Sequence, residues 1–364
     1  MDSTQKAFIQ QLALPNTKCV LSNWSRLRAS RKHGIIYLDD PTIKHQNFAP
    51  SLYYASTLGL TPLVGKLIDN GADLNELGGE WGTALQAASY ENRLEITRLL
   101  LEKGADINAT GGEYGTALQT ASYRGHLEIA RLLLEKGADI NATGGQYGTA
   151  LQAASCGRKL EIARLLLEKG ADVNATGGEY GTALQAASYE GHLEIARLLL
   201  EKGADVDATG GEYGTALQAA SFMGGLDISQ LLLENGADIN ATGGEYGTAL
   251  QAASFMGGLD ISQLLLENGA DVNLKGGEYG TALQAAAYGE EFEIVKLLLE
   301  KGAEVNATGG ECGSALQAAR DTYIGRTAEA IVQLLKEHGA LEMEPDVESD
   351  NTLVTAPQSA IARF

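Results

Sequence analysis

One motif recurs along most of the chain at a fixed interval, and it constrains the fold more than any other feature. The motif reads Gly-Thr-Ala-Leu, or Gly-Ser-Ala-Leu in the last copy, and each copy begins 33 residues after the one before it. A fixed period of about 20 to 50 residues is typical of stacked repeats, in which each unit packs only on its neighbours. The sequence therefore predicts an elongated array. The eight copies begin at Gly82, Gly115, Gly148, Gly181, Gly214, Gly247, Gly280 and Gly313.

Each copy carries the signals of two short helices and a loop. Thr182 precedes Gln185 by three residues, which is the spacing of a capping box at the start of a helix. After a turn, apolar residues return at helical spacing over 193–199, and Gly203 is the kind of residue that ends a helix. The polar, glycine-rich stretch that leads on to Tyr213 is expected to form a projecting loop.

This order of elements resembles the ankyrin repeat, whose usual signature is TPLHxAA followed by GHLEVVKLLLxxGADVN. The chain has TALQAA followed by GHLEIARLLLEKGADVD, so Ala183 and Gln185 stand in place of the family's Pro and His. The resemblance covers residues 50 to 341 and implies an all-α ankyrin-repeat solenoid of about nine helix-turn-helix units with β-hairpin-like loops. The GGxYGTALQAAS variant also resembles arrays of filamentous-fungal proteins, many of which carry a nucleotide-binding domain upstream.

The two ends of the chain differ from the repeats. Residues 1–49 are net basic and are predicted to form a helical cap or connector, although the basic run RLRASRKH also permits nuclear localisation or docking. Residues 50–77 read as a degenerate first repeat, and residues 78–341 read as eight repeats. The last repeat has a four-residue insertion around 320–329, expected to lengthen its first helix or its turn. Residues 342–364 read as a disordered acidic tail.

Charge and cysteine content restrict the possible partners and compartments. The formal net charge is -20, which disfavours nucleic-acid binding by the repeats because such binding requires Lys and Arg at phosphates. The acidity is consistent with a soluble monomer, and alternatively with a partner that has a basic surface. The three cysteines are scattered, and no signal peptide or apolar stretch of membrane-spanning length is evident. We therefore expect a cytoplasmic, possibly nuclear, protein that is not secreted and does not enter a membrane.

No motif for catalysis, cofactor binding or metal binding is present in the sequence. The chain lacks the GxxxxGK[ST] phosphate loop, the GxSxG elbow, HExxH, and Cys and His pairs at metal-ligand spacing. His126 and His192 occupy the Gly-His turn of the repeat, apart from any Ser, Cys or Asp partner in a motif. The sequence therefore predicts neither an enzyme nor a protein with a cofactor or a metal site.

Aromatic residues at two repeat positions are the candidate binding residues. Aromatic side chains with a polar tip are enriched at interaction hot spots, but rings that recur at one loop position can equally pack on one another and stiffen the loops. Both interpretations remain open from the sequence. The loop candidates are Trp81, Tyr114, Tyr147, Tyr180, Tyr213, Tyr246 and Tyr279, and those at the turn between the helices are Tyr123, Tyr189, Phe222 and Phe255.

The resemblance implies a non-catalytic protein–protein interaction scaffold or sensor, which binds a partner protein on a concave face of loops and first helices. Two alternatives remain. The first is a regulatory subunit that masks a basic segment of a transcription factor or an enzyme. The second is the separated ankyrin portion of a multidomain nucleotide-binding signalling protein.

Overall fold

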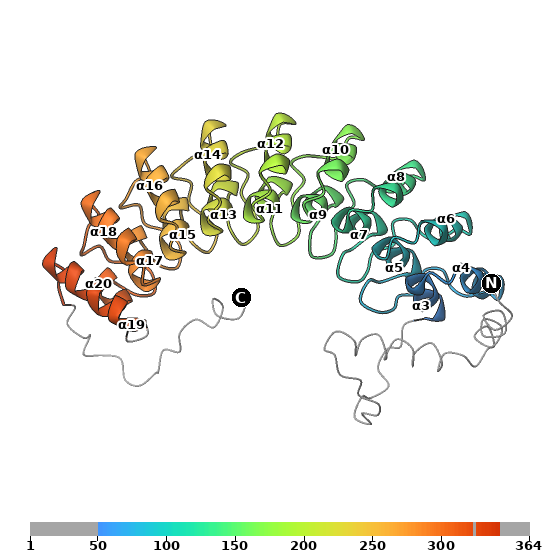
Figure 1. Cartoon of the computed structure of the whole chain (residues 1–364), viewed down its shortest axis with the longest axis horizontal. Helices are drawn as coiled ribbons and strands as arrows, with labels where there is room; N and C mark the ends of the chain where they lie inside the picture. The colour runs from blue at the N-terminus through green and yellow to red at the C-terminus, as the bar shows by residue number, and fades with distance from the viewer. Residues whose placement is uncertain (1–49, 323–324, 343–364) are drawn as a thin grey trace, which may run out of the picture.

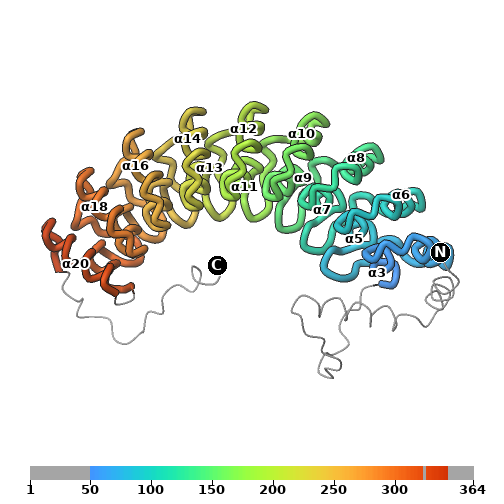
Figure 2. Tube along the Cα trace, viewed as in Figure 1, coloured from blue at the N-terminus to red at the C-terminus, as the bar shows by residue number. Residues whose placement is uncertain are grey.

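The repeats form a curved stack of helix pairs. A computed structural model describes residues 50–322 and 325–342, which contain eighteen α-helices in nine helix-turn-helix units. The second helices follow the outer side of the arc, while the first helices lie on its inner side (Figure 1). Figure 2 shows the loops between units bending toward that inner side as well. In the described part of the chain no strand forms, and only isolated β-bridges such as Gly177–Gly181 occur in the loops. The prediction of an all-α solenoid of about nine units is confirmed.

The units are numbered 1 to 9 along the chain, and each consists of a first and a second helix. The first helices are α3 (Ser51–Leu58), α5 (Ala84–Tyr90), α7 (Ala117–Arg124), α9 (Ala150–Cys156), α11 (Ala183–Tyr189), α13 (Ala216–Phe222), α15 (Ala249–Phe255), α17 (Ala282–Tyr288) and α19 (Ala315–Asp321). The second helices are α4 (Thr61–Asp69), α6 (Leu94–Glu102), α8 (Leu127–Glu135), α10 (Leu160–Glu168), α12 (Leu193–Glu201), α14 (Leu226–Glu234), α16 (Leu259–Glu267), α18 (Phe292–Glu300) and α20 (Arg326–Glu337).

A capping box starts each first helix of units 2 to 8. In unit 5 the Thr182 Oγ1 accepts the Gln185 N–H at 3.2 Å, and the Gln185 Oε1 accepts the Thr182 N–H at 2.6 Å. These bonds satisfy two of the backbone donors that every helix start leaves without an intrahelical partner. The Thr-to-Gln spacing in the sequence therefore predicts the helix starts correctly.

The same glutamine also joins each unit to the next. The Gln185 Nε2 donates to the carbonyl oxygens of Gly210, at 3.0 Å, and of Gly214, both in the loop that follows unit 5. The Gln185 side chain is only 2% exposed. Gly181 has a φ of +90°, and a Cβ there would overlap Gln185 Oε1, so this position requires glycine. One buried amide thus fixes both the start of a helix and the path of the following loop.

A single apolar core runs through all nine units. It extends from Leu52 in α3 to Leu335 in α20, and it is built from small residues of the first helices and aliphatic residues of the second. Within unit 5, Leu184, Ile195 and Leu199 are buried between the helix pair and its neighbours. Because no unit encloses its own core, stacking supplies the burial that each unit lacks.

The end units differ from the regular ones. In unit 1, Pro50 precedes α3 and no side chain caps the helix. In unit 9, α19 keeps seven residues while α20 has twelve instead of nine, so most of the four-residue insertion lengthens the second helix. The sequence left two alternatives, a longer first helix or a longer turn; the first helix keeps its length, and the turn spans four residues instead of three. The expected cap over 1–49 and the tail beyond Glu342 lie outside the described residues.

The hydrogen bonds from the Gln185 side chain to the following loop can be tested by their effect on stability, and unit 9 provides a control. We expect Gln185→Ala to lower the free energy of unfolding by about 2–3 kcal/mol, because buried loop carbonyls lose their donor. Gln317, the equivalent residue of unit 9, is exposed, and its side-chain Nε2 donates to Asp321 Oδ1 at 2.6 Å rather than to a finger loop. Gln317→Ala should therefore change stability by no more than about 0.5 kcal/mol. Urea unfolding followed by circular dichroism measures both, and equal effects would contradict the assigned role.

Candidate protein-binding surface

The loops between units are joined to one another through their backbones. We call these segments finger loops; each lies between the second helix of one unit and the first helix of the next, as residues 206–214 do. From the second finger loop onward, the N–H of the residue before the loop aromatic donates to the carbonyl of the equivalent residue one unit earlier. The Glu179 N–H, for example, donates to the Gln146 carbonyl at 2.9 Å, and the Glu212 N–H to the Glu179 carbonyl at 3.3 Å. The finger loops thus form one continuous hydrogen-bonded strip.

Glycine allows the finger loops to approach this closely. Gly178 has a φ of +64°, and a Cβ at this position would overlap the backbone carbonyl carbon of Tyr147 in the preceding finger loop. A side chain there would therefore push neighbouring loops apart and break the strip.

The backbone strip holds a row of carboxylates in register along the loop tips. Its members are Glu80, Glu113, Glu179, Glu212, Glu245, Glu278 and Glu311, with Gln146 as the single neutral position. Burial raises the pKa of Glu278, and the neighbouring carboxylates of Glu311 and Glu245 raise it further. Gln146 relieves this repulsion locally, because its Nε2 donates to the Glu179 Oε2 at 2.8 Å. The strip is therefore a concentrated line of negative charge.

Beside this row, the candidate aromatic residues stack into one array, which we call the aromatic ladder. Rings from the finger loops alternate with rings from the ends of the first helices. Trp81 and Tyr90 lie 4.2 Å apart between ring centroids, and Tyr123 and Tyr147 lie 4.6 Å apart, both pairs nearly parallel. Finger-loop rings also stack on one another, as Tyr147 does on Tyr180 at 6.5 Å beside Cys156, where a helix-end ring is absent.

The structure brings all eleven candidate aromatic residues into the ladder and adds four. The additional members are Tyr53, Tyr54, Tyr90 and Tyr288. Tyr90 and Tyr288 occupy the same repeat position as Tyr123, so comparing the copies at that position could have identified them from the sequence. Tyr53 and Tyr54 lie in the degenerate first repeat, where no such alignment was possible.

No ring of the ladder is fully exposed, and several are buried. Tyr114, Tyr147, Tyr246 and Tyr279 are 4–9% exposed, and Phe222 is also buried. The remaining finger-loop rings, Trp81, Tyr180 and Tyr213, are half-buried, as are Tyr123, Tyr189 and Phe255 at the helix ends. The ladder therefore stiffens the finger loops along its whole length and exposes ring edges only in part.

Burial also sets the acid–base chemistry of the ladder. Burial raises the pKa of Tyr180, and the nearby Cys156 and Glu190 raise it further. The Tyr180 hydroxyl donates to the Glu190 Oε1 at 3.0 Å. Burial likewise raises the pKa of the Cys156 thiol to about 12, so this cysteine stays protonated and unreactive at neutral pH.

The two turn histidines have structural partners in the preceding unit. The His126 Nε2 lies 2.9 Å from the Tyr90 carbonyl, and the His192 Nε2 lies 3.0 Å from the Cys156 carbonyl. Burial lowers the pKa of both imidazoles, which favours the neutral ring. Within residues 50–322 and 325–342, no group of three or more His, Cys, Asp or Glu residues is arranged to hold a metal ion. Over the same ranges, no helix combines the length and the apolar character needed to cross a membrane.

The enclosed ladder predicts an unusual alkaline titration. Burial raises the pKa of Tyr53 to about 12 and raises the pKa of Tyr147, Tyr213 and Tyr246 as well. A free tyrosine has a pKa near 10, so at about pH 11 part of the tyrosinate absorbance should appear only when urea unfolds the protein. Because the folded pKa values are raised, these rings should also cost stability as the pH rises above about 10.

The check is a near-ultraviolet absorbance titration with and without urea. Complete ionisation of the folded protein with an ordinary midpoint would mean that the rings are open to solvent, which contradicts an enclosed ladder.

Comparison with known proteins agrees with this geometry. A family model for ankyrin repeats in sets of three copies matches residues 52–144, 112–177, 152–243 and 217–309, together more than half of the chain. A search of curated proteins gave no significant match. Ankyrin repeats generally mediate protein–protein interaction and are typically non-catalytic, whereas the narrower likeness to fungal arrays stays a prediction. The helix-pair units, the 33-residue period and the family match lead to one conclusion: the chain belongs to the ankyrin-repeat family.

Proposed function

We propose that the protein binds a partner protein along the inner side of the arc, and that the partner presents a basic segment to the finger loops. The observation that carries this proposal is the row of carboxylates on the hydrogen-bonded strip. The fixed backbone sets the spacing of the charges before any partner arrives, so binding does not have to order the loops.

The aromatic ladder supports the same surface in a second way. Half-buried rings such as Tyr180 and Tyr213 are held by stacking on both sides, so their exposed edges form rigid contact area. Rigid aromatic area next to charge is a common composition of interaction hot spots. Cationic side chains can pair with the carboxylates while their aliphatic stems cover the ring edges.

The electrostatic part of this proposal is testable with matched triple variants. In the first, Glu179→Gln, Glu212→Gln and Glu245→Gln remove three charges from the strip. In the control, Glu135→Gln, Glu168→Gln and Glu201→Gln remove three exposed charges from the ends of second helices on the outer side. Each lost pairing with a basic side chain should cost about 0.5–1 kcal/mol, so the strip variant should bind at least about tenfold more weakly. The control should bind as the parent does.

The measurement is capture of partners from a lysate of the source cells, followed by titration of the captured partner at low and at high salt. Binding should weaken with salt for the parent and for the control, and much less for the strip variant. Circular dichroism of the parent and both triple variants is the control that each protein is folded. Equal binding by both triple variants, or binding that is insensitive to salt, would contradict a basic segment on the finger loops.

A further inference from the structure

One turn position carries a side chain that covers the preceding unit in most of the array. This position lies directly before each second helix. Arg93 donates from Nε to the Thr57 carbonyl at 3.2 Å, and His126 and His192 reach the carbonyls of Tyr90 and Cys156 in the same way. Lys159 lies against Gly125 in the turn of the unit before it. A side chain at this position therefore fills the space between consecutive turns.

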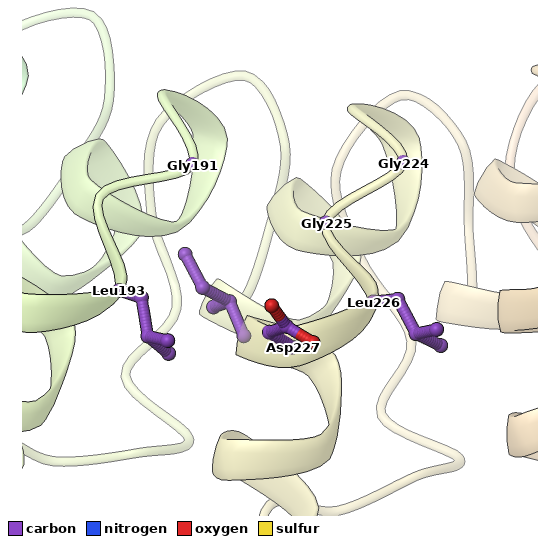
Figure 3. Close-up of a pocket in the computed structure, with 7 residues that line it drawn as sticks. Gly191, Leu193, Gly224, Gly225, Leu226 and Asp227 are labelled. Carbon is purple, nitrogen blue, oxygen red and sulfur yellow. The ribbon is translucent and has the colours of Figure 1, made fainter.

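Units 6 and 7 have glycine at this position, and the space stays open. Gly225 and Gly258 have no side chain to cover the preceding turns. As a result, a Cβ built on Gly191 or on Gly224 would meet no heavy atom within 4 Å. At the junction of units 5 and 6 lies a pocket of about 280 Å³ that is open to solvent (Figure 3). We call it the cavity, and it is lined by Gly191, Leu193, Gly224, Gly225, Leu226, Asp227 and Ile228.

The surroundings of this cavity are unusually apolar for the surface of the array. Met223 is 44% exposed, Leu226 37% and Leu259 38%. The two other large apolar side chains with comparable exposure in the described residues, Leu77 and Leu341, lie near the two ends of the array. Exposed apolar side chains grouped around a cavity mark a place where another apolar group can be buried.

The stretch of the array that contains units 6 and 7 is also acidic, with no basic residue to balance its carboxylates. Residues 203–274 contain ten Asp and Glu residues and no Lys, Arg or His. Units 3 to 5 have an arginine on the second helix, such as Arg197, where units 6 and 7 have Gln230 and Gln263. At the cavity itself Asp227 is exposed at the start of α14, and Glu194 and Asp260 occupy the same position in the adjacent units. A cationic group next to the cavity would therefore meet carboxylates from units 5 to 7. Residues 203–274 contribute no competing positive charge, while unit 5 contributes Arg197 on α12.

We propose that this cavity is a second docking site, which takes an extended segment of a partner protein with one aliphatic side chain flanked by Lys or Arg. The aliphatic side chain enters the cavity beside Leu193 and Leu226, which both line it. The flanking cations pair with Asp227 and with Glu194 or Asp260. The site uses none of the finger-loop residues, so its failure would leave the proposed function of the strip intact.

The direct test uses synthetic peptides and the full chain with isotope-labelled leucine methyl groups. The first peptide has one central leucine with two arginines on each side in a glycine–serine background. The second has alanine for the leucine, and the third has glutamine for the arginines. We expect the first peptide to shift the methyl signals of Leu193 and Leu226 and to bind at least tenfold more tightly than either of the others.

One substitution closes the cavity with a side chain that the array already uses. Gly225 has φ −79° and ψ 72°, close to the φ −92° and ψ 73° of His192, and the nearest atom to its Cβ position is 3.4 Å away. Gly225→His is therefore expected to fold normally and to weaken binding of the leucine peptide at least tenfold. Lys159→His, which places the same residue at the same position two units earlier, should leave that binding unchanged.

Several outcomes would overturn the proposal. Equal affinity for the leucine and alanine peptides would show that the cavity takes no side chain, and full binding by Gly225→His would place the peptide elsewhere. Self-association of the parent that Gly225→His abolishes, without peptide binding, would assign the site to a second copy of the chain. If the methyl signals of the free full chain already matched the peptide-saturated state, a segment of the chain itself would be the occupant.

Discussion

A buried glutamine amide in each regular unit is the contact on which the rest of the array depends. Its oxygen accepts the backbone N–H that starts the first helix, and its nitrogen donates to carbonyls of the next finger loop, as Gln185 does toward Thr182, Gly210 and Gly214. Because both ends of the amide are used, a helix start and a loop 25 to 29 residues away are set by one side chain. In unit 9, the last unit among the described residues, the Gln317 Nε2 donates to Asp321 Oδ1 instead.

The other contacts between units follow the same pattern, in which each unit is joined to the units next to it. Backbone bonds between finger loops, ring stacking along the aromatic ladder and the continuous aliphatic core all connect a unit only with its neighbours. Such nearest-neighbour coupling keeps carboxylates in a row despite their repulsion, because no single loop can move without breaking contacts on both sides. Where one contact is omitted, as at Gly225, the fold persists and a cavity appears instead.

The fold was predictable because its signals are local and repeated. The capping pair Thr182–Gln185 and the leucine pattern of each second helix specify the helices within one copy. The target of the Gln185 nitrogen was not predictable in the same way, because it lies in the next loop and depends on how units stack. Ring burial at Tyr147 and the cavity beside Gly225 depend on that stacking as well. The insertion in unit 9 has no counterpart in the other copies, so the sequence alone could not show that most of it lengthens α20.

Amide hydrogen exchange at the finger-loop tips measures most directly whether the loops form one hydrogen-bonded strip. The N–H groups of Gln146, Glu179 and Glu212 each donate to the preceding loop, although their side chains lie at or near the surface. These amides are expected to exchange slowly, with protection comparable to that of the first helices on either side. Exchange at the rate of open loops, in units whose helices remain protected, would contradict a hydrogen-bonded strip.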